Sequence, residues 1–231
     1  MKTIGILGGM GPSATAGLYQ RILRLCQIQH GAVQDKDYPG IIIYSMSLKG
    51  SDESGIADRN TLLNELIAGV VRLTAAGCDF IVLPSNTAHI FISELKEHSV
   101  VPIISMIDKT VQMVAMNSVR CIGLLASEDS YHYEIYVNAL AKNGIKLVIP
   151  SEIEQKGITR IILHVMGGEV HNNVDWDTLY SIIKHMEQMG AEAVIIGCTE
   201  LSLVISAKEY PLKVYDSLDL LAKAAVEMAY G

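Results

Sequence analysis

Two stretches of this chain align without a gap, and this internal repeat constrains the fold more than any other feature. Residues 77–87 read GCDFIVLPSNT, and residues 190–200 read GAEAVIIGCTE. Glycine falls on glycine, an acidic residue on an acidic residue, and an apolar run on an apolar run. The starts of the two halves match more loosely, residues 4–7 with residues 122–125. A half-length repeat predicts two similar lobes.

The second copy of the repeat has the pattern of a buried strand that leads into a helix. Ala193–Ile196 is short, apolar and partly β-branched, and Gly197 bounds it, as expected for a strand buried on both faces. Thr199 can cap a following helix, so we expect Cys198 in the turn between strand and helix. Ligands of open α/β sheets bind at the carboxyl ends of the strands, where this turn would lie. A helix N-terminus also lowers the pKa of a thiol.

Ser85 occupies the position in the first copy that Cys198 occupies in the second. If the two lobes face each other, these two small nucleophilic side chains lie on opposite sides of one cleft. The repeat therefore predicts an active site in the cleft between the lobes.

Apolar runs and helical patterns alternate along the chain, which predicts an α/β fold with a parallel sheet flanked by helices in each lobe. We place residues 1–100 and 211–231 in the first lobe and residues 101–210 in the second. The expected strands cover residues 3–7, 41–46, 80–83, 101–105, 120–125, 146–149, 193–196 and 212–215.

The composition narrows the class of protein. Half of the 231 residues are hydrophobic, enough for a sizeable core and unlike a disordered chain. The net charge of −7 argues against nucleic acid or a membrane surface as a partner, although one local arginine can still bind a small acidic substrate. No apolar run approaches the roughly 18 residues that span a bilayer. The four cysteines have no metal-ligand spacing, and free thiols predict a cytoplasmic protein.

A glycine-rich turn follows the first expected strand. Gly9, Gly11 and Ala14 satisfy a loose dinucleotide fingerprint. Against that interpretation, no acidic residue ends the next strand, and Pro12 removes a backbone donor. The turn is either a tight strand-to-helix connection or a backbone cradle for a carboxylate at a helix N-terminus.

Arg59 and His89 are two further candidates for functional residues, and each also has a purely structural interpretation. Arg59 ends a long polar segment, residues 47–60, just before a helix expected from Thr61; a single loop arginine is often only a solvated charge. Ser85 and His89 are four residues apart, so they can share one helical face, although a lone helical histidine is often structural.

Together these motifs resemble the aspartate/glutamate racemase family of cofactor-independent amino-acid racemases, over nearly the whole chain. The matching positions are Gly8–Pro12 with Ala14 and Thr15, Ala57–Arg59, Asn86–His89, Gly197–Glu200, and Asp216 between the last strand and the last helix. The resemblance implies two lobes with a small acidic amino acid between them, aspartate before glutamate. It also implies a homodimer, and catalysis without pyridoxal phosphate or a metal.

The resemblance assigns roles to individual residues. Cys198 is the acid/base of the second lobe and Ser85 the group on the opposite face of the substrate Cα, while Arg59 clamps a substrate carboxylate, for which bidentate arginine is suited. The remaining positions are the substrate contacts Met10, Asn86, Thr87 and Thr199 and the supporting residues His89 and Glu200.

The chain departs from the family pattern at two positions. Many members have a first cysteine where this chain has Ser85; some carry a hydroxyl residue, and an engineered Cys→Ser change would read the same. Members often have a lysine where this chain has Met166, two residues before Gly168. The second departure bears on how an acidic side chain would be recognised.

Serine and cysteine are unequal bases. A thiol has a pKa near 8.5, whereas the pKa of a serine hydroxyl lies far higher, near that of water, so serine gives up its own proton far less readily. Ser85 therefore needs help, for example from His89, to act as a base, but it can donate a proton to a carbanion. Two alternatives remain open: a single-thiol lyase or isomerase of the same superfamily, and a binding or regulatory protein without activity.

Overall fold

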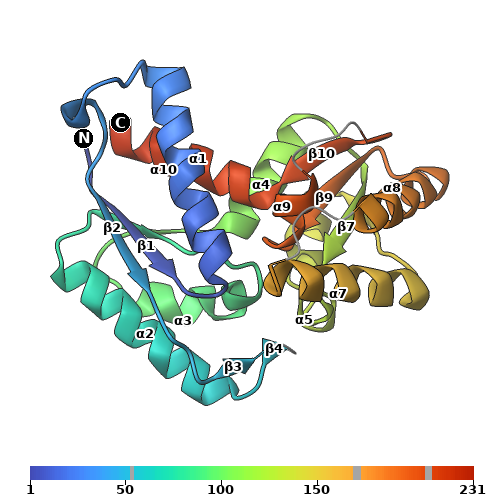
Figure 1. Cartoon of the computed structure of the whole chain (residues 1–231), viewed down its shortest axis with the longest axis horizontal. Coiled ribbons are helices and arrows are strands. Elements are labelled where there is room, and N and C mark those ends of the chain that lie inside the picture. The colour runs from blue at the N-terminus through green and yellow to red at the C-terminus, as the bar shows by residue number, and fades with distance from the viewer. Residues whose placement is uncertain (53–54, 169–172, 206–209) are drawn as a thin grey trace. The chain divides into compact units, whose positions relative to one another are not determined.

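The computed structural model describes residues 1–52, 55–168, 173–205 and 210–231 (Figure 1). The chain forms two compact units, one of residues 1–106 and 218–231 and the other of residues 107–217. Each unit contains a parallel four-stranded sheet with helices against it. The α/β fold class with two similar lobes is therefore confirmed.

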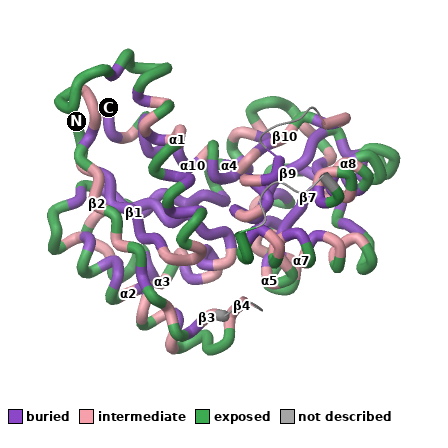
Figure 2. Tube along the Cα trace, viewed as in Figure 1, coloured by how far each residue is buried: buried purple, intermediate pink, exposed green. Residues whose placement is uncertain are grey.

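The sheet of the first unit has the strand order β2-β1-β5-β6, all parallel. The central strand β1 is buried along its whole length (Figure 2), and so is the central strand β5, while β2 and β6 lie at the edges. The bounds are β1 Ile4–Gly8, β2 Ile41–Ser45, β5 Phe80–Val82 and β6 Ile103–Ile104.

Helices cover both faces of this sheet because side chains alternate along β1. Ile4 and Ile6 pack with Leu18 and Ile22 of α1 and with residues of α10. Leu7 points to the other face, where α2 and α3 lie. The bounds are α1 Pro12–His30, α2 Arg59–Ala75, α3 Ile92–Glu97 and α10 Ser217–Tyr230, with the 3-10 helices η1 Asp35–Asp37 and η2 Thr87–Phe91.

The second unit repeats this topology with the order β10-β9-β7-β8. Val194 and Ile196 of β9 pack against α7, α8 and α9. The strands are β7 Cys121–Ala126, β8 Lys146–Val148, β9 Ala193–Gly197 and β10 Lys213–Asp216. The helices are α4 Met106–Met116, α5 Glu128–His132, α6 Val137–Lys142, α7 Glu152–Met166, α8 Asn173–Gln188 and α9 Leu201–Ile205.

The structure confirms the internal repeat in detail. β5 pairs with β1 as β9 pairs with β7, and the glycine that opens each copy has a left-handed φ, 90° in the first and 93° in the second. The acidic residue of each copy holds the neighbouring strand. Asp79 accepts the Thr3 N–H at 2.6 Å, and Glu192 accepts the Arg120 N–H at 3.0 Å.

The unit boundaries differ from those expected from the sequence. Residues 211–231 were assigned to the first lobe, but β10 pairs with β9 in the second unit, and only α10 joins the first. At the other boundary, β6 pairs with β5, so the first unit extends to Met106 rather than to residue 100. The hydrogen-bonding partner decides where a short edge strand belongs, and the apolar pattern alone does not identify that partner.

Residues 47–52 and 55–60 contain more regular structure than the expected loop. They contain an antiparallel pair, β3 Ser51–Asp52 and β4 Gly55–Ile56. α2 begins at Arg59, two residues before the expected start, because the Asp58 carboxylate accepts the N–H groups of Asn60 and Thr61 at 3.0 and 3.1 Å. Aspartate is a preferred N-cap residue, so Asp58 was the available signal.

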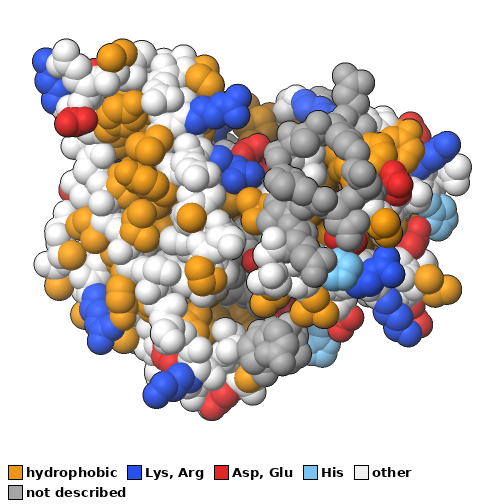
Figure 3. All heavy atoms as spheres, viewed as in Figure 1, with side chains coloured by type: hydrophobic (Ala, Val, Ile, Leu, Met, Phe, Trp, Pro, Cys, Tyr) orange, Lys and Arg blue, Asp and Glu red, His pale blue; other side chains and the backbone are white. Residues whose placement is uncertain are grey.

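A hollow of about 440 Å³ with a mixed polar and apolar lining lies beside β2 in the first unit. Figure 3 shows hydrophobic side chains gathered over α1 and β2. Tyr38, Pro39 and Ile41 line the hollow at the amino-terminal end of β2. Ser85 lies beyond the carboxyl-terminal end of the same parallel sheet. The hollow is therefore separate from the candidate site.

Over the residues that the structure describes, no helix is both long and apolar enough to cross a membrane.

Candidate active site

Ser85 lies just beyond the carboxyl end of β5 and is buried, with 7% of its surface exposed. Its hydroxyl oxygen accepts the N–H of Ala88 at 3.3 Å. Asn86, also buried, and Thr87, the first residue of η2, follow directly. A backbone donor on the serine oxygen stabilises negative charge there, which suits a hydroxyl that gives up a proton.

His89 is buried and bonds to the backbone through both ring nitrogens. Nδ1 lies 2.6 Å from the carbonyl oxygen of Ser85, and Nε2 accepts the N–H of Met106 at 2.9 Å. Since Nε2 accepts, Nδ1 carries the proton and donates it to the carbonyl. Ser85 precedes η2, so the two residues do not share a helical face as predicted. The imidazole bonds to the serine backbone and does not serve as a base for its hydroxyl.

Arg59 is the first residue of α2 and is held beside η2. Its guanidinium carbon lies 4.6 Å from the centre of the buried Phe91 ring, and Nη2 lies 3.5 Å from Oε1 of Glu94. The side chain is still 49% exposed. These contacts place an accessible guanidinium near the helix that follows Ser85.

The glycine-rich turn connects β1 to α1. Gly9 has a φ of 102°, and a Cβ there would lie 2.2 Å from the carbonyl oxygen of Met46, so only glycine fits. The Gly9 N–H donates to Thr15 Oγ1 at 3.0 Å, and that hydroxyl donates to the Gly11 carbonyl at 3.2 Å. These bonds favour the tight-turn interpretation. Met10 and Ser85 both follow the carboxyl-terminal ends of neighbouring parallel strands, β1 and β5.

Cys198 follows β9 directly and is buried, with 6% of its surface exposed. Its sulfur lies 3.2 Å from Oε2 of Glu200, and the hydroxyl of Thr199 donates to the same oxygen at 3.1 Å. Gly197 ends β9 in close packing, since a Cβ there would lie 2.7 Å from Cδ1 of Leu124. The predicted turn position of Cys198 is confirmed, but α9 begins at Leu201, two residues after Thr199, so Thr199 is not its cap as expected.

The predicted lowering of the thiol pKa is wrong. Burial first, and then the charge and hydrogen bond of the Glu200 carboxylate, raise the pKa of Cys198 well above its usual value. The N–H groups of Glu200 and Leu201 also bond to the sulfur and act in the opposite direction. α9 spans only five residues. The effect of its N-terminus, which would favour the thiolate, is outweighed by desolvation and a nearby negative charge.

One buried polar group that the sequence did not single out, Tyr136, interacts electrostatically with this thiol. Tyr136 is fully buried; its pKa is raised by burial and, to a smaller extent, by the charges of Asp216 and Cys198, against hydrogen bonds to Ser217 and Thr110. Ser202 donates to Asp216 at 2.8 Å. Asp216 was found from its place at the strand end, whereas the tyrosine and hydroxyl residues carry no local signal.

The site residues thus fall into two groups. Met10, Arg59, Ser85, Asn86, Thr87 and His89 belong to the first unit, and Cys198, Thr199 and Glu200 to the second. Within the described residues, no cluster of three or more His, Cys, Asp or Glu side chains is arranged to hold a metal ion.

Comparison with known proteins identifies the family. Residues 7–225 match the Asp/Glu/hydantoin racemase family. The chain belongs to this family. The racemase is 31% identical to the broad-specificity amino-acid racemase RacX of Bacillus subtilis strain 168 over 225 residues, which are 96% of each chain.

Solved structures agree with this assignment. An aspartate racemase homologue from Pyrococcus horikoshii OT3 has 29% identity and a TM-score of 0.83, with both chains fully covered. The aspartate racemase of Picrophilus torridus has 26% identity and a TM-score of 0.83, covering 100% of this racemase and 95% of that chain. The glutamate racemase of Francisella tularensis, at 15% identity and a TM-score of 0.73 over 99% and 81% of the two chains, shares the fold.

Proposed function

We propose that this protein racemises an acidic amino acid at Cα, aspartate first and glutamate second, without pyridoxal phosphate or a metal ion. The observation that carries the proposal is the thiol of Cys198 at the end of β9, bonded to the Glu200 carboxylate in a chain of the racemase family. A thiolate can take the α-proton, and a second group can return a proton from the other face.

The proposed roles are unequal. Cys198 is the principal base, and Ser85 donates a proton to the opposite face of the carbanion, helped by the Ala88 N–H on its oxygen. Arg59, held over Phe91 but exposed, clamps a substrate carboxylate. Further substrate contacts are Met10, Asn86, Thr87 and Thr199, and His89 and Glu200 support the two acid/base residues.

A broader substrate range is a second candidate, favoured by two observations. Met166, the last residue of α7, is 54% exposed and apolar where a lysine would recognise an acidic side chain. A relative with 31% identity is named as a broad-specificity racemase. The same acid/base residues would then act on neutral amino acids.

A chirality assay across aspartate, glutamate and neutral amino acids tests the proposal. Fastest conversion of aspartate supports the first candidate, and fastest conversion of a neutral amino acid supports the second. Hydroxylamine or a chelator should leave the rate unchanged. Release of carbon dioxide from a malonate-type acid would instead identify a single-thiol lyase, and binding without turnover would identify a protein without activity.

We also propose that the protein works in the cytoplasm as a homodimer. All four cysteines are free thiols, which suits a reducing compartment, and the homodimer follows from the family resemblance. Light scattering on the purified protein should give twice the mass of the chain, and a monomer would contradict this assignment.

A further inference from the structure

The edge strand β2 differs from the other edge strands of the two four-stranded sheets. A strand at a sheet edge exposes unpaired N–H and C=O groups, and proteins usually protect such an edge by shortness, charge or proline. β6 spans two residues directly after Pro102, β8 begins with Lys146, and β10 begins with Lys213. β2 spans five residues and reads IIIYS, without a charge or a proline. It is therefore an unprotected edge.

Alternate residues of β2 turn their backbone groups away from the sheet. The carbonyl of Gly40 accepts the N–H of Ile4 at 2.8 Å, so Gly40 and every second residue after it face β1. The N–H and C=O groups of Ile41, Ile43 and Ser45 consequently point outward. Among the described residues, none forms a hydrogen bond with these outward groups. They are available to a further strand.

Apolar and aromatic side chains flank this edge on both faces of the sheet. On one face, Tyr19 and Leu23 of α1 line the hollow beside β2 together with Ile43, which is 42% exposed (Figure 3). On the other face, the guanidinium carbon of Arg72 lies 5.2 Å from the centre of the Tyr44 ring. An open edge between such flanks is suited to binding a strand, because both backbone pairing and apolar burial are on offer.

The strand that fits is β2 of a second copy. In an antiparallel pair, opposite residues whose backbone groups face each other exchange two hydrogen bonds. A two-fold axis beside Ile43 places Ile43 opposite its own copy and Ile41 opposite Ser45 of the second copy, so every outward group obtains a partner. We propose that β2 pairs antiparallel with β2 of a second copy and joins the two sheets into one. The inference rests on the homodimer proposed above and assigns its interface.

The charges around β2 favour this symmetric contact. A two-fold axis brings the central residue against itself, so a charge there would face a like charge, and residues 38–48 contain no charged side chain. Antiparallel pairing also brings the segment before β2 in one copy toward the segment after β2 in the other. The first segment carries Asp35 and Asp37 with Lys36 between them, and Lys49 is the first charged residue after β2. The two ends therefore have opposite net charge.

The second copy would also cover the hollow of about 440 Å³ beside β2. Directly opposed side chains of an antiparallel pair lie on the same face of the sheet. Ile43 of the second copy therefore lies on the face that carries Tyr19 and Leu23. Removing these apolar side chains from water stabilises the association. An extended strand of another protein can satisfy the same backbone groups, but the match of both charged ends is specific to a copy of this strand.

Ile43→Lys tests the pairing without changing the core, because the side chain is half-exposed. Two lysines would lie opposite each other at the axis, and like charges opposed across an interface are costly. In analytical ultracentrifugation, the unaltered protein should have twice the mass of the chain. The variant should have the mass of one chain, with the Kd of the dimer raised about 100-fold or more and the circular dichroism spectrum unchanged. A dimer that persists in Ile43→Lys would overturn the proposal.

Ile43→Glu adds a test of the symmetry. This variant alone should also have the mass of one chain. An equal mixture of Ile43→Glu and Ile43→Lys should recover twice that mass, because a carboxylate then faces an ammonium group across the axis. Recovery requires position 43 of one copy to meet position 43 of the other, which a merely destabilised fold does not predict. A mixture that stays monomeric would overturn the pairing of β2 with itself.

Val100→Lys is the matched control. Val100 is 87% exposed and precedes β6 at the opposite edge of the same sheet, so this variant should keep the dimer mass. A monomeric Val100→Lys variant would show that any added surface lysine dissociates the dimer and would overturn the assignment to β2.

The outcome is separable from that of the proposed homodimer. An unaltered protein with the mass of one chain would remove both the homodimer and this interface. A dimer that Ile43→Lys leaves intact would keep the homodimer and remove only the role of β2. The chirality assay tests the racemase proposal independently of both.

Discussion

The Nδ1 atom of His89 lies 2.6 Å from the carbonyl oxygen of Ser85. The other ring nitrogen accepts the N–H of Met106, the first residue of α4. The imidazole therefore fixes the segment that carries the serine hydroxyl and ties it to the end of the first unit. Ser85 has to act without an imidazole base, which agrees with a role as a proton donor.

Removal of the imidazole should destabilise the fold. His89→Ala leaves a buried carbonyl and a buried N–H without this partner, at roughly 1–3 kcal/mol each, so we expect the free energy of unfolding in urea to fall by about 2–6 kcal/mol. His98→Ala is the matched control, because His98 makes the same type of bond to the Glu94 carbonyl at 2.8 Å on the surface. Equal losses in the two variants would contradict a buried structural role for His89.

Unequal acid/base residues should give unequal isotope exchange. In D₂O, the enantiomer whose Cα–H faces Cys198 should take up deuterium in the remaining substrate before it inverts, whereas the enantiomer that faces Ser85 should exchange only as fast as it inverts. NMR or mass spectrometry of the remaining substrate measures both rates.

Substitutions separate the two residues. Cys198→Ala should abolish exchange and inversion, while Ser85→Cys should raise the racemisation rate and make exchange more symmetrical. Cys121→Ala, at the start of β7, should leave the exchange pattern unchanged. Near-normal exchange in Cys198→Ala, or equal exchange of both enantiomers in the unaltered protein, would show that Cys198 is not the principal base.

Arg59 should control substrate affinity. Arg59→Lys loses the bidentate fork, so we expect KM for the best substrate to rise about ten-fold or more in steady-state kinetics. Arg72→Lys is the control, because Arg72 is also on α2 and lies over an aromatic ring, that of Tyr44. An unchanged KM in Arg59→Lys would return Arg59 to the role of a surface charge.

Glu94 should oppose the same binding step. Its carboxylate lies 3.5 Å from the Arg59 guanidinium and competes with a substrate carboxylate for it. Glu94→Gln should therefore lower KM, by a few-fold at most because the pair is half exposed and screened. An increase in KM would show that Glu94 positions Arg59 rather than competing for it.

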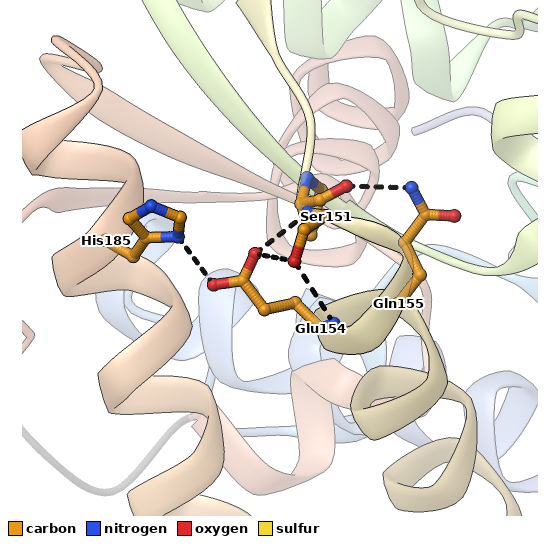
Figure 4. Close-up of polar contacts among 5 residues, drawn as sticks. Ser151, Glu154, Gln155 and His185 are labelled. Carbon is orange, nitrogen blue, oxygen red and sulfur yellow. Dashed lines mark hydrogen bonds and ion pairs between the residues drawn. The ribbon is translucent and has the colours of Figure 1, made fainter.

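The link between α7 and α8 should be sensitive to acid. Glu154 accepts bonds from the Ser151 N–H and hydroxyl at 2.8 and 2.6 Å, and its other oxygen lies 2.7 Å from His185 of α8 (Figure 4). Burial raises the pKa of Glu154, but the bonds to Ser151 and His185 outweigh it, so the pKa is lowered. This stabilisation is present above the unfolded pKa of about 4.3 and is lost as the pH falls through the folded-state pKa.

Glu154→Gln tests this pH dependence. At pH 6 the variant should lose about 1 kcal/mol of unfolding free energy, as for a lost helix cap, and the difference from the unaltered protein should shrink as the pH falls toward 3. Glu152→Gln, exposed in the same first turn, should show little difference at either pH. A Glu154→Gln deficit that stays constant down to pH 3 would contradict the assignment.

The sequence alone determined the local architecture. The alternation of apolar runs and helical patterns predicted the strands of both sheets, and the repeat placed Ser85 and Cys198 at equivalent strand ends. These features depend on neighbouring residues, whose periodicity is visible in the chain. Asp58 is equally visible in the sequence as the cap of α2, because aspartate is a preferred N-cap residue.

Tertiary structure decided the rest. β10 belongs to the second sheet because it bonds to β9, and His89 finds its second partner at Met106, 17 residues away. The sequence indicated a helix end that lowers the thiol pKa of Cys198, but burial reversed the direction. Desolvation depends on atoms from segments far apart in the chain, and only the folded protein brings them around the sulfur.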